Sequence, residues 1–124
     1  MVRIYKCDKC GAILEIAKDG HGITCCGEPM KELTANSEDA AVEKHVPAVT
    51  VDGNTVTVKV GDVEHPMMDA HYIAHIWLES TDGVQRKDLT PSDKPEAVFA
   101  LADGVKPVAA YEYCNLHGFW VKNL

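Results

Sequence analysis

The sequence predicts an all-β protein in which a small, metal-stapled module precedes an antiparallel β-sandwich. Three observations support this prediction. Short segments with alternating apolar and polar residues lie between turn signals, and no segment has a convincing helical period. Four of the five cysteines fall within the first 36 residues. We therefore expect two domains, at residues 1–36 and 37–124.

Residues 1–36 are expected to form the metal-stapled module. Cys7-Asp8-Lys9-Cys10-Gly11 is typical of a knuckle, residues 12–16 of a short strand, and Cys25-Cys26-Gly27 of a closing turn. So short a segment cannot bury enough apolar area to be stable alone, and a bound metal commonly supplies the missing stability. The small, polar residues at 34–40 are typical of a linker.

Residues 37–124 are expected to form the sandwich. Residues 49–51 and 55–60 flank the turn Asp52-Gly53-Asn54 and predict a β-hairpin, because both segments alternate with a period of two. The hydrophobic fraction of the chain, 46%, is sufficient for a core.

A second alternating segment runs from His71 to Ser80. Alternation places Ile73 on the same face as His75, and Ile76 on the opposite face. Further strand candidates follow at residues 98–101 and 108–113. Short strands between turns, without helical segments, predict an antiparallel sandwich.

Composition and charge limit the compartment and the partners. No apolar run reaches the roughly 18 residues of a membrane helix, and the first residues lack the apolar region of a secretory signal. We therefore expect a cytoplasmic protein with reduced cysteines.

Residues 1–36 carry five basic and five acidic side chains, whereas residues 37–124 carry seven basic and fourteen acidic side chains, which gives the net charge of −7. This balance argues against nucleic acid and membrane partners, because phosphate binding needs a basic patch.

The first metal motif is Cys7-x2-Cys10 followed by the adjacent pair Cys25-Cys26. Four cysteines at this spacing predict a tetrahedral metal site. Two disulfides are the first alternative, and structural zinc is the second, because four thiolates suit both zinc and iron. Neighbouring cysteines cannot both bind one metal without distortion, so we expect a strained tetrahedron, which iron bound by four sulfurs tolerates.

The second motif combines one cysteine with four histidines. A soft thiolate with several imidazoles suits a redox metal such as iron or copper better than calcium or magnesium. Five ligands of this kind leave one octahedral position open, which indicates chemistry rather than a structural role. The candidate ligands are His45, His65, His71, Cys114 and His117.

Together, these motifs resemble those of desulfoferrodoxin, the two-iron class of superoxide reductase. The likeness runs from the first knuckle to the last predicted strand, in the order and spacing of that family. Agreement at two independent metal sites makes the likeness specific. The segments that carry it are Cys7-x2-Cys10, Cys25-Cys26, Glu43-Lys44-His45-Val46-Pro47, His65-Pro66-Met67, His71-Tyr72-Ile73 and Cys114-Asn115-Leu116-His117-Gly118.

The resemblance implies a desulforedoxin-like first domain that holds one iron with four cysteines, and an immunoglobulin-like sandwich that holds a catalytic iron. It implies one-electron reduction of superoxide to hydrogen peroxide without release of oxygen. It also implies a homodimer that receives electrons from a rubredoxin-like carrier. The implied ligands of the catalytic iron are His45, His65, His71 and His117 in the equatorial positions and Cys114 in the axial position.

The resemblance further implies roles for the two residues before His45. Lys44 is expected to attract the superoxide anion and to orient a proton-donating water, and Glu43 to take the sixth position on the oxidised iron. His75 stands where the family pattern has tryptophan, and we interpret it as a residue that does not bind the metal.

Three alternatives stay open on the residues alone. The first is an electron-transfer or redox-sensing iron protein without catalysis, and the second is a zinc module joined to an interaction domain. The third is a dismutase, which releases oxygen from half of its superoxide, whereas a reductase consumes external electrons and releases only peroxide. The step from redox iron to superoxide reduction depends mainly on the resemblance.

Overall fold

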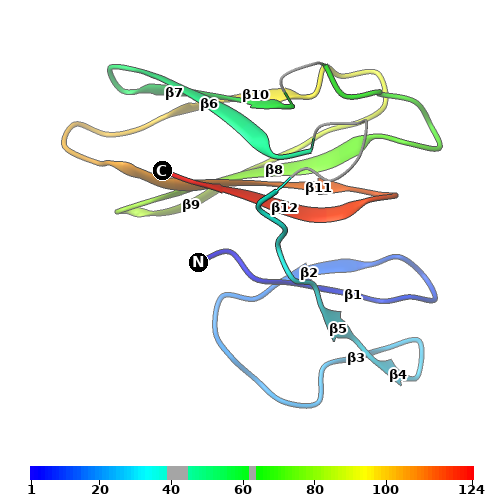
Figure 1. Cartoon of the computed structure of the whole chain (residues 1–124). Coiled ribbons are helices and arrows are strands. Elements are labelled where there is room, and N and C mark those ends of the chain that lie inside the picture. The colour runs from blue at the N-terminus through cyan, green and yellow to red at the C-terminus, as the bar shows by residue number, and fades with distance from the viewer. Residues whose placement is uncertain (39–44, 62–63) are drawn as a thin grey trace. The chain divides into compact units, whose positions relative to one another are not determined.

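The computed structural model describes residues 1–38, 45–61 and 64–124, and its regular elements are all β-strands (Figure 1). The predicted all-β class is therefore confirmed. By internal contacts the chain divides into two units, Met1–Thr34 and Ala35–Leu124. Within the described ranges, no helix is long and apolar enough to cross a membrane.

The first unit has two very small sheets. β1 (Ile4–Lys6) pairs with β2 (Ile13–Glu15) and β5 (Lys31–Glu32), and β3 (Thr24–Cys25) pairs with β4 (Glu28–Pro29). Few of its side chains are buried, and its ion pairs lie at the surface, where each contributes little to stability. We therefore expect the stability of this unit to depend on a metal held by its cysteines.

The second unit is a sandwich of two antiparallel sheets, which Figure 1 shows as stacked layers. The three-stranded sheet has the order β10-β7-β6, and the four-stranded sheet has the order β12-β11-β8-β9. The strands are β6 (Pro47–Asp52), β7 (Thr55–Val60), β8 (Ile73–Ser80), β9 (Gly83–Asp88), β10 (Glu96–Ala100), β11 (Pro107–Cys114) and β12 (Gly118–Asn123).

Two hairpins of this sandwich follow directly from turn chemistry. β6 and β7 pair up to Asp52 and Thr55, so Gly53-Asn54 forms the two-residue loop, and the predicted hairpin is present. β11 and β12 pair up to Cys114 and Gly118, which leaves a three-residue loop. Gly118 has φ +89°, the left-handed conformation that closes three-residue loops of this kind.

The core fills the space between the two sheets. The three-stranded sheet contributes Val56, Val58, Val60 and Phe99, among others, and the four-stranded sheet contributes Ile76, Leu78, Ala110 and Cys114. Cys114 is the last residue of β11 and is fully buried, so this candidate metal ligand lies at the edge of the core.

One side-chain direction differs from the prediction. Strict alternation places Ile73 with His75, but Ile73 is fully buried in the same core cluster as Ile76. The register explains the difference, because Tyr113 pairs with His75 while Cys114 pairs with Ile73, so Ala74 is an extra residue on β8. Such a bulge reverses the side-chain alternation of the residues that precede it.

Replacement of Ile76 by alanine tests this core. Ile76 is fully buried in β8, and its truncation is expected to lower the free energy of unfolding by about 2–5 kcal/mol. Val84→Ala on the exposed strand β9 is the control and should change it by less than about 0.5 kcal/mol. Urea unfolding followed by tryptophan fluorescence reports the sandwich alone, because Trp77 and Trp120 both lie in it. Equal effects of the two substitutions would contradict the assignment of the core.

Candidate metal centres

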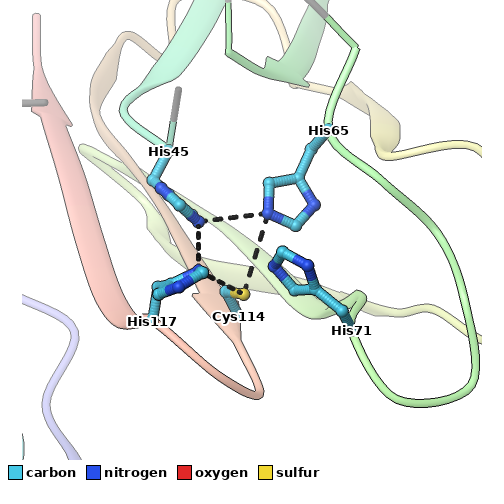
Figure 2. Close-up of side chains that lie close together, drawn as sticks. All are labelled: His45, His65, His71, Cys114 and His117. Carbon is cyan, nitrogen blue, oxygen red and sulfur yellow. Dashed lines mark hydrogen bonds between the residues drawn. The ribbon is translucent and has the colours of Figure 1, made fainter. Parts of the chain in front are cut away.

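The five candidate ligands of the second motif come from separate elements and converge on one point. His45 lies just before β6, His65 and His71 lie in the segment that leads into β8, Cys114 ends β11, and His117 lies in the β11–β12 loop. Their ligand atoms all lie within 4.8 Å of one another. Figure 2 shows the four imidazole rings and the sulfur directed toward a shared space.

The four rings, which we call the imidazole quartet (His45, His65, His71 and His117), form a closed four-sided arrangement. Centroids of successive rings are 4.8 Å (His45–His65), 4.7 Å (His65–His71), 4.9 Å (His71–His117) and 4.8 Å (His117–His45) apart. Each pair is edge-on, with interplanar angles from 64° to 83°. Within this arrangement, each ring places one nitrogen within 4.8 Å of the ligand atoms of the others.

The distances between these nitrogens fit a metal. Nε2 of His45 is 3.1 Å from Nε2 of His65 and 3.2 Å from Nδ1 of His117. Metal–nitrogen bonds of about 2.1 Å at right angles separate two nitrogens by about 3.0 Å. The sulfur of Cys114 lies 3.7 Å from Nε2 of His65 and 4.0 Å from Nδ1 of His117, so it joins the same group.

Contacts of the rings with the surrounding protein fix which nitrogen is available. Nδ1 of His65 lies 2.8 Å from the carbonyl oxygen of Pro66, to which an N–H at that position donates. This leaves the lone pair of Nε2 for the centre of the site, the arrangement usual for metal-binding histidines. His117 uses Nδ1 instead, which leaves Nε2 on the far side of an exposed residue.

Trp120 contacts two members of the imidazole quartet, and sequence reasoning gave it no role. Its ring is stacked on that of His45, with centroids 4.9 Å apart and planes 16° apart. Its indole N–H donates to the carbonyl oxygen of His117 at 3.1 Å. The stacking on His45 depends on how β12 passes the start of β6, which no local pattern reveals.

The four cysteines of the first motif also form a group. Cys7, Cys10, Cys25 and Cys26 place their sulfurs within 4.8 Å of one another, and none of them forms a disulfide. The sulfurs of Cys10 and Cys25 are 3.5 Å apart, and those of Cys25 and Cys26 are 3.9 Å apart. The cysteines are not joined as disulfides in this structure, and four sulfurs this close together can enclose one metal in a tetrahedral site.

The adjacent cysteines share one centre because of their turn. Cys25 pairs with Glu28, so Cys26-Gly27 is the two-residue loop of the β3–β4 hairpin. Both loop residues have positive φ, +54° for Cys26 and +77° for Gly27, as in a type I′ turn. Among the described residues, Cys26 is the single non-glycine with positive φ. The expected distortion therefore lies in the backbone of Cys26.

The pKa values of two cysteines in this group are shifted in opposite directions. A hydrogen bond from the backbone of Cys10, assisted by Lys9, lowers the pKa of Cys7 to about 7. Hydrogen bonds with the thiols of Cys10, Cys7 and Cys26 raise the pKa of Cys25 to about 12. The neighbouring sulfurs thus oppose ionisation of Cys25, and a bound cation compensates the charge that all four thiolates would carry.

Comparison with known proteins agrees with these two sites. A family described as desulfoferrodoxin matches residues 37–123, and one described as the desulfoferrodoxin N-terminal domain matches residues 1–33. The chain belongs to the desulfoferrodoxin family. The resemblance noted in the motifs is therefore confirmed.

Two of the similar proteins match nearly the whole chain, and a third matches about three quarters of it. A desulfoferrodoxin of Syntrophotalea carbinolica is 47% identical over 120 residues, which are 96% of this chain and 94% of the relative. The crystal structure of the superoxide reductase from Treponema pallidum has a TM-score of 0.86 at 34% identity, and the match covers 99% of this chain and 98% of that one. A superoxide reductase of Thermococcus kodakarensis is 34% identical over an alignment of 108 residues, and the match covers 73% of this chain and 94% of that one.

The structure thus brings all nine candidate ligands of this desulfoferrodoxin-family chain into two groups. His75 belongs to neither group, and its Nδ1 lies 2.8 Å from Oδ1 of Asp88. Its ring packs beside Trp77 and Tyr113. The two residues with implied catalytic roles, Glu43 and Lys44, lie outside the residues that the structure describes.

The turn at Gly27 makes a testable contribution to the cysteine site. Gly27→Ala places a side chain at φ +77°, where an L-residue costs roughly 1–2 kcal/mol. Because folding and metal binding of so small a unit are coupled, we expect about tenfold weaker metal binding. Gly20→Ala is the matched control, since a Cβ there also meets open space but without positive φ. Chelator competition measures both, and equal affinities would exclude a contribution from the turn.

Proposed function

We propose that this protein is a superoxide reductase, which transfers one electron to superoxide at iron held by the imidazole quartet and Cys114. With two protons from solvent, each superoxide and one external electron give one hydrogen peroxide, and no oxygen is released. The observation that carries this proposal is the closed quartet of imidazoles with a single thiolate beside it. Five ligands of this kind leave a sixth position for substrate.

The donor set suits a small anionic substrate. Iron bound here supplies a one-electron couple next to an open coordination position. The imidazoles are neutral ligands, and Cys114 contributes one negative charge, so the centre with Fe(II) retains a formal charge of about +1. A local positive site attracts an anion even though the chain has a net charge of −7.

The five ligands differ in their exposure to solvent. Cys114 is fully buried, which keeps its thiolate away from water and oxidants, and His45, His65 and His71 are buried as well. His117 is exposed, and solvent therefore reaches the cluster at its edge. Protons can enter at this edge without a path through the core.

Glu43 and Lys44 extend the proposal by their place in the sequence. Lys44 directly precedes His45, and we assign to it attraction of superoxide and orientation of a proton-donating water. To Glu43 we assign binding at the sixth position in the oxidised state, because carboxylates prefer harder ions.

We also propose the cellular setting of this activity. A rubredoxin-like carrier would supply the electron that each turnover consumes, and the protein would act as a homodimer in the cytoplasm. Pairing of two copies would help a first unit that buries few side chains of its own. The cysteine centre has no open position, so it would relay electrons if it holds iron, whereas zinc would only stabilise the fold.

Product stoichiometry tests the proposed reaction. With an excess of reduced rubredoxin, the wild type should form one hydrogen peroxide for each superoxide consumed and release no oxygen. Cys114→Ser should lose this activity, whereas the control His75→Ala should retain it, because His75 belongs to neither ligand group. An oxygen electrode and a peroxide assay measure both products. One oxygen released per two superoxide ions would indicate a dismutase, and no reaction above background would indicate an electron-transfer protein.

Charge at residue 44 is testable through the rate of reaction with superoxide. Lys44→Ala should slow the second-order reaction about tenfold at low salt and reduce its salt dependence, because screening weakens attraction between charges. Lys44→Arg should keep most of the rate. Lys106→Ala is the control, because Lys106 is exposed next to the end of β11 opposite Cys114. Pulse radiolysis measures these rates, and equal rates for Lys44→Ala and Lys106→Ala would contradict the assigned role.

A further inference from the structure

Asn115 lies between two ligands in the β11–β12 loop, yet its side chain points to a different part of the site. Its Oδ1 accepts a hydrogen bond from the backbone N–H of Tyr72 at 2.9 Å. Its Nδ2 donates to the carbonyl oxygen of Ala70 at 3.1 Å. These two backbone groups stand on either side of His71, so one amide holds the chain before and after that ligand.

Further backbone hydrogen bonds hold the same segment in place. The N–H of Asn115 donates to the carbonyl oxygen of Tyr72 at 3.2 Å. On the other side, Met68 and His71 exchange two hydrogen bonds of 2.9 and 3.0 Å, which close the turn from 68 to 71. His71 is thereby fixed between its own turn and the loop that carries Cys114 and His117.

The geometry requires an amide at this position. A planar carboxamide carries a donor and an acceptor side by side, and it can therefore pair with a backbone carbonyl and a backbone N–H at once. Aspartate keeps the acceptor for Tyr72 but loses the donor for Ala70. Alanine loses both partners and leaves only the backbone bond from Asn115 to Tyr72.

The other members of the imidazole quartet are fixed by different contacts. His45 is stacked on Trp120, His65 has the carbonyl of Pro66 beside Nδ1, and the carbonyl of His117 accepts from Trp120. Asn115 acts instead on the backbone around His71, from a loop that is distant in sequence. Its removal should therefore affect one imidazole more than the others.

We propose that Asn115 is a positioning residue that sets His71 in the imidazole quartet by joining the segment of His71 to the loop of Cys114 and His117. This inference rests on the proposed function, in which the five side chains hold one metal. A group that orients a metal ligand without touching the metal commonly contributes 10–100-fold to metal affinity. The same range is expected here.

Cobalt(II) titration of the metal-free full chain tests this role without turnover. Cys114→Ser lacks the thiolate-to-cobalt band of the second site, so the difference between the wild-type and Cys114→Ser spectra isolates that band. Asn115→Ala and Asn115→Asp should both keep the thiolate-to-cobalt band that depends on Cys114, but bind cobalt about 10–100-fold more weakly in chelator competition. If His71 is no longer held in place, four ligands remain at the second site. The visible ligand-field bands of both variants should therefore intensify, because four-coordinate cobalt(II) absorbs more strongly than five-coordinate cobalt(II).

Asn54→Ala is the matched control. It removes another asparagine amide, which binds Asp103 at the β6–β7 turn, and it should leave cobalt binding unchanged. Circular dichroism of each variant verifies that the sandwich is folded. Wild-type affinity and ligand-field bands in folded Asn115→Ala would overturn the positioning role alone. A wild type that lacks any Cys114-dependent band would overturn the proposed site and this inference with it.

A double-mutant cycle separates positioning from general stabilisation. If Asn115 acts through His71, its replacement by alanine should cost little further cobalt affinity in a His71→Ala background. The penalty should persist in a His45→Ala background, because His45 is held by Trp120 instead. An undiminished penalty in the His71→Ala background would show that Asn115 acts on the loop as a whole, contrary to the proposal.

Discussion

The structure of the second unit depends on one constraint: ring nitrogens and a thiol sulfur face one another in a largely buried space. Two of these nitrogens are 3.1 Å apart, and the buried sulfur lies 3.7 Å from one of them, so their lone pairs face one another. Facing lone pairs are costly in a core. A cation that accepts every lone pair removes the conflict, and so metal binding and local folding are coupled.

The sandwich makes this arrangement possible by bringing distant segments to one end. The β11–β12 hairpin supplies Cys114 and His117 from a three-residue loop whose geometry is fixed by Gly118. The bulge at Ala74 turns Ile73 into the core just after the segment of His71. Rigid strands thus set the ligand positions, while the loops provide the ligands themselves.

The sequence was informative wherever the signal is local. Alternating strands and the turn at Gly53 predicted the all-β class, and the cysteine spacing predicted the first ligand group, because each depends on near neighbours. The ligands of the second group are distant in sequence, and they were predicted from ligand type together with the family resemblance. The direction of Ile73 was wrong because a bulge arises from pairing with β11 and leaves no mark on β8 alone. The contacts of Trp120 with His45 and of Asn115 with Tyr72 were missed for the same reason, because these partners are distant in sequence. Short polar and aromatic residues give no local indication of such contacts.

The two centres direct their ligands to one metal in different ways. In the cysteine centre the ligands are neighbours in sequence, and the backbone of Cys26 must adopt a left-handed conformation to direct both sulfurs to one point. In the centre of the imidazole quartet the ligands come from separate segments, so unstrained backbone suffices, but outer contacts must hold each ring. Four cysteines fill all coordination positions of a tetrahedral metal, whereas five ligands positioned by the surrounding protein leave one octahedral position open. Reactivity therefore belongs to the second centre, because its geometry is kept by the surrounding protein rather than by a full set of ligands.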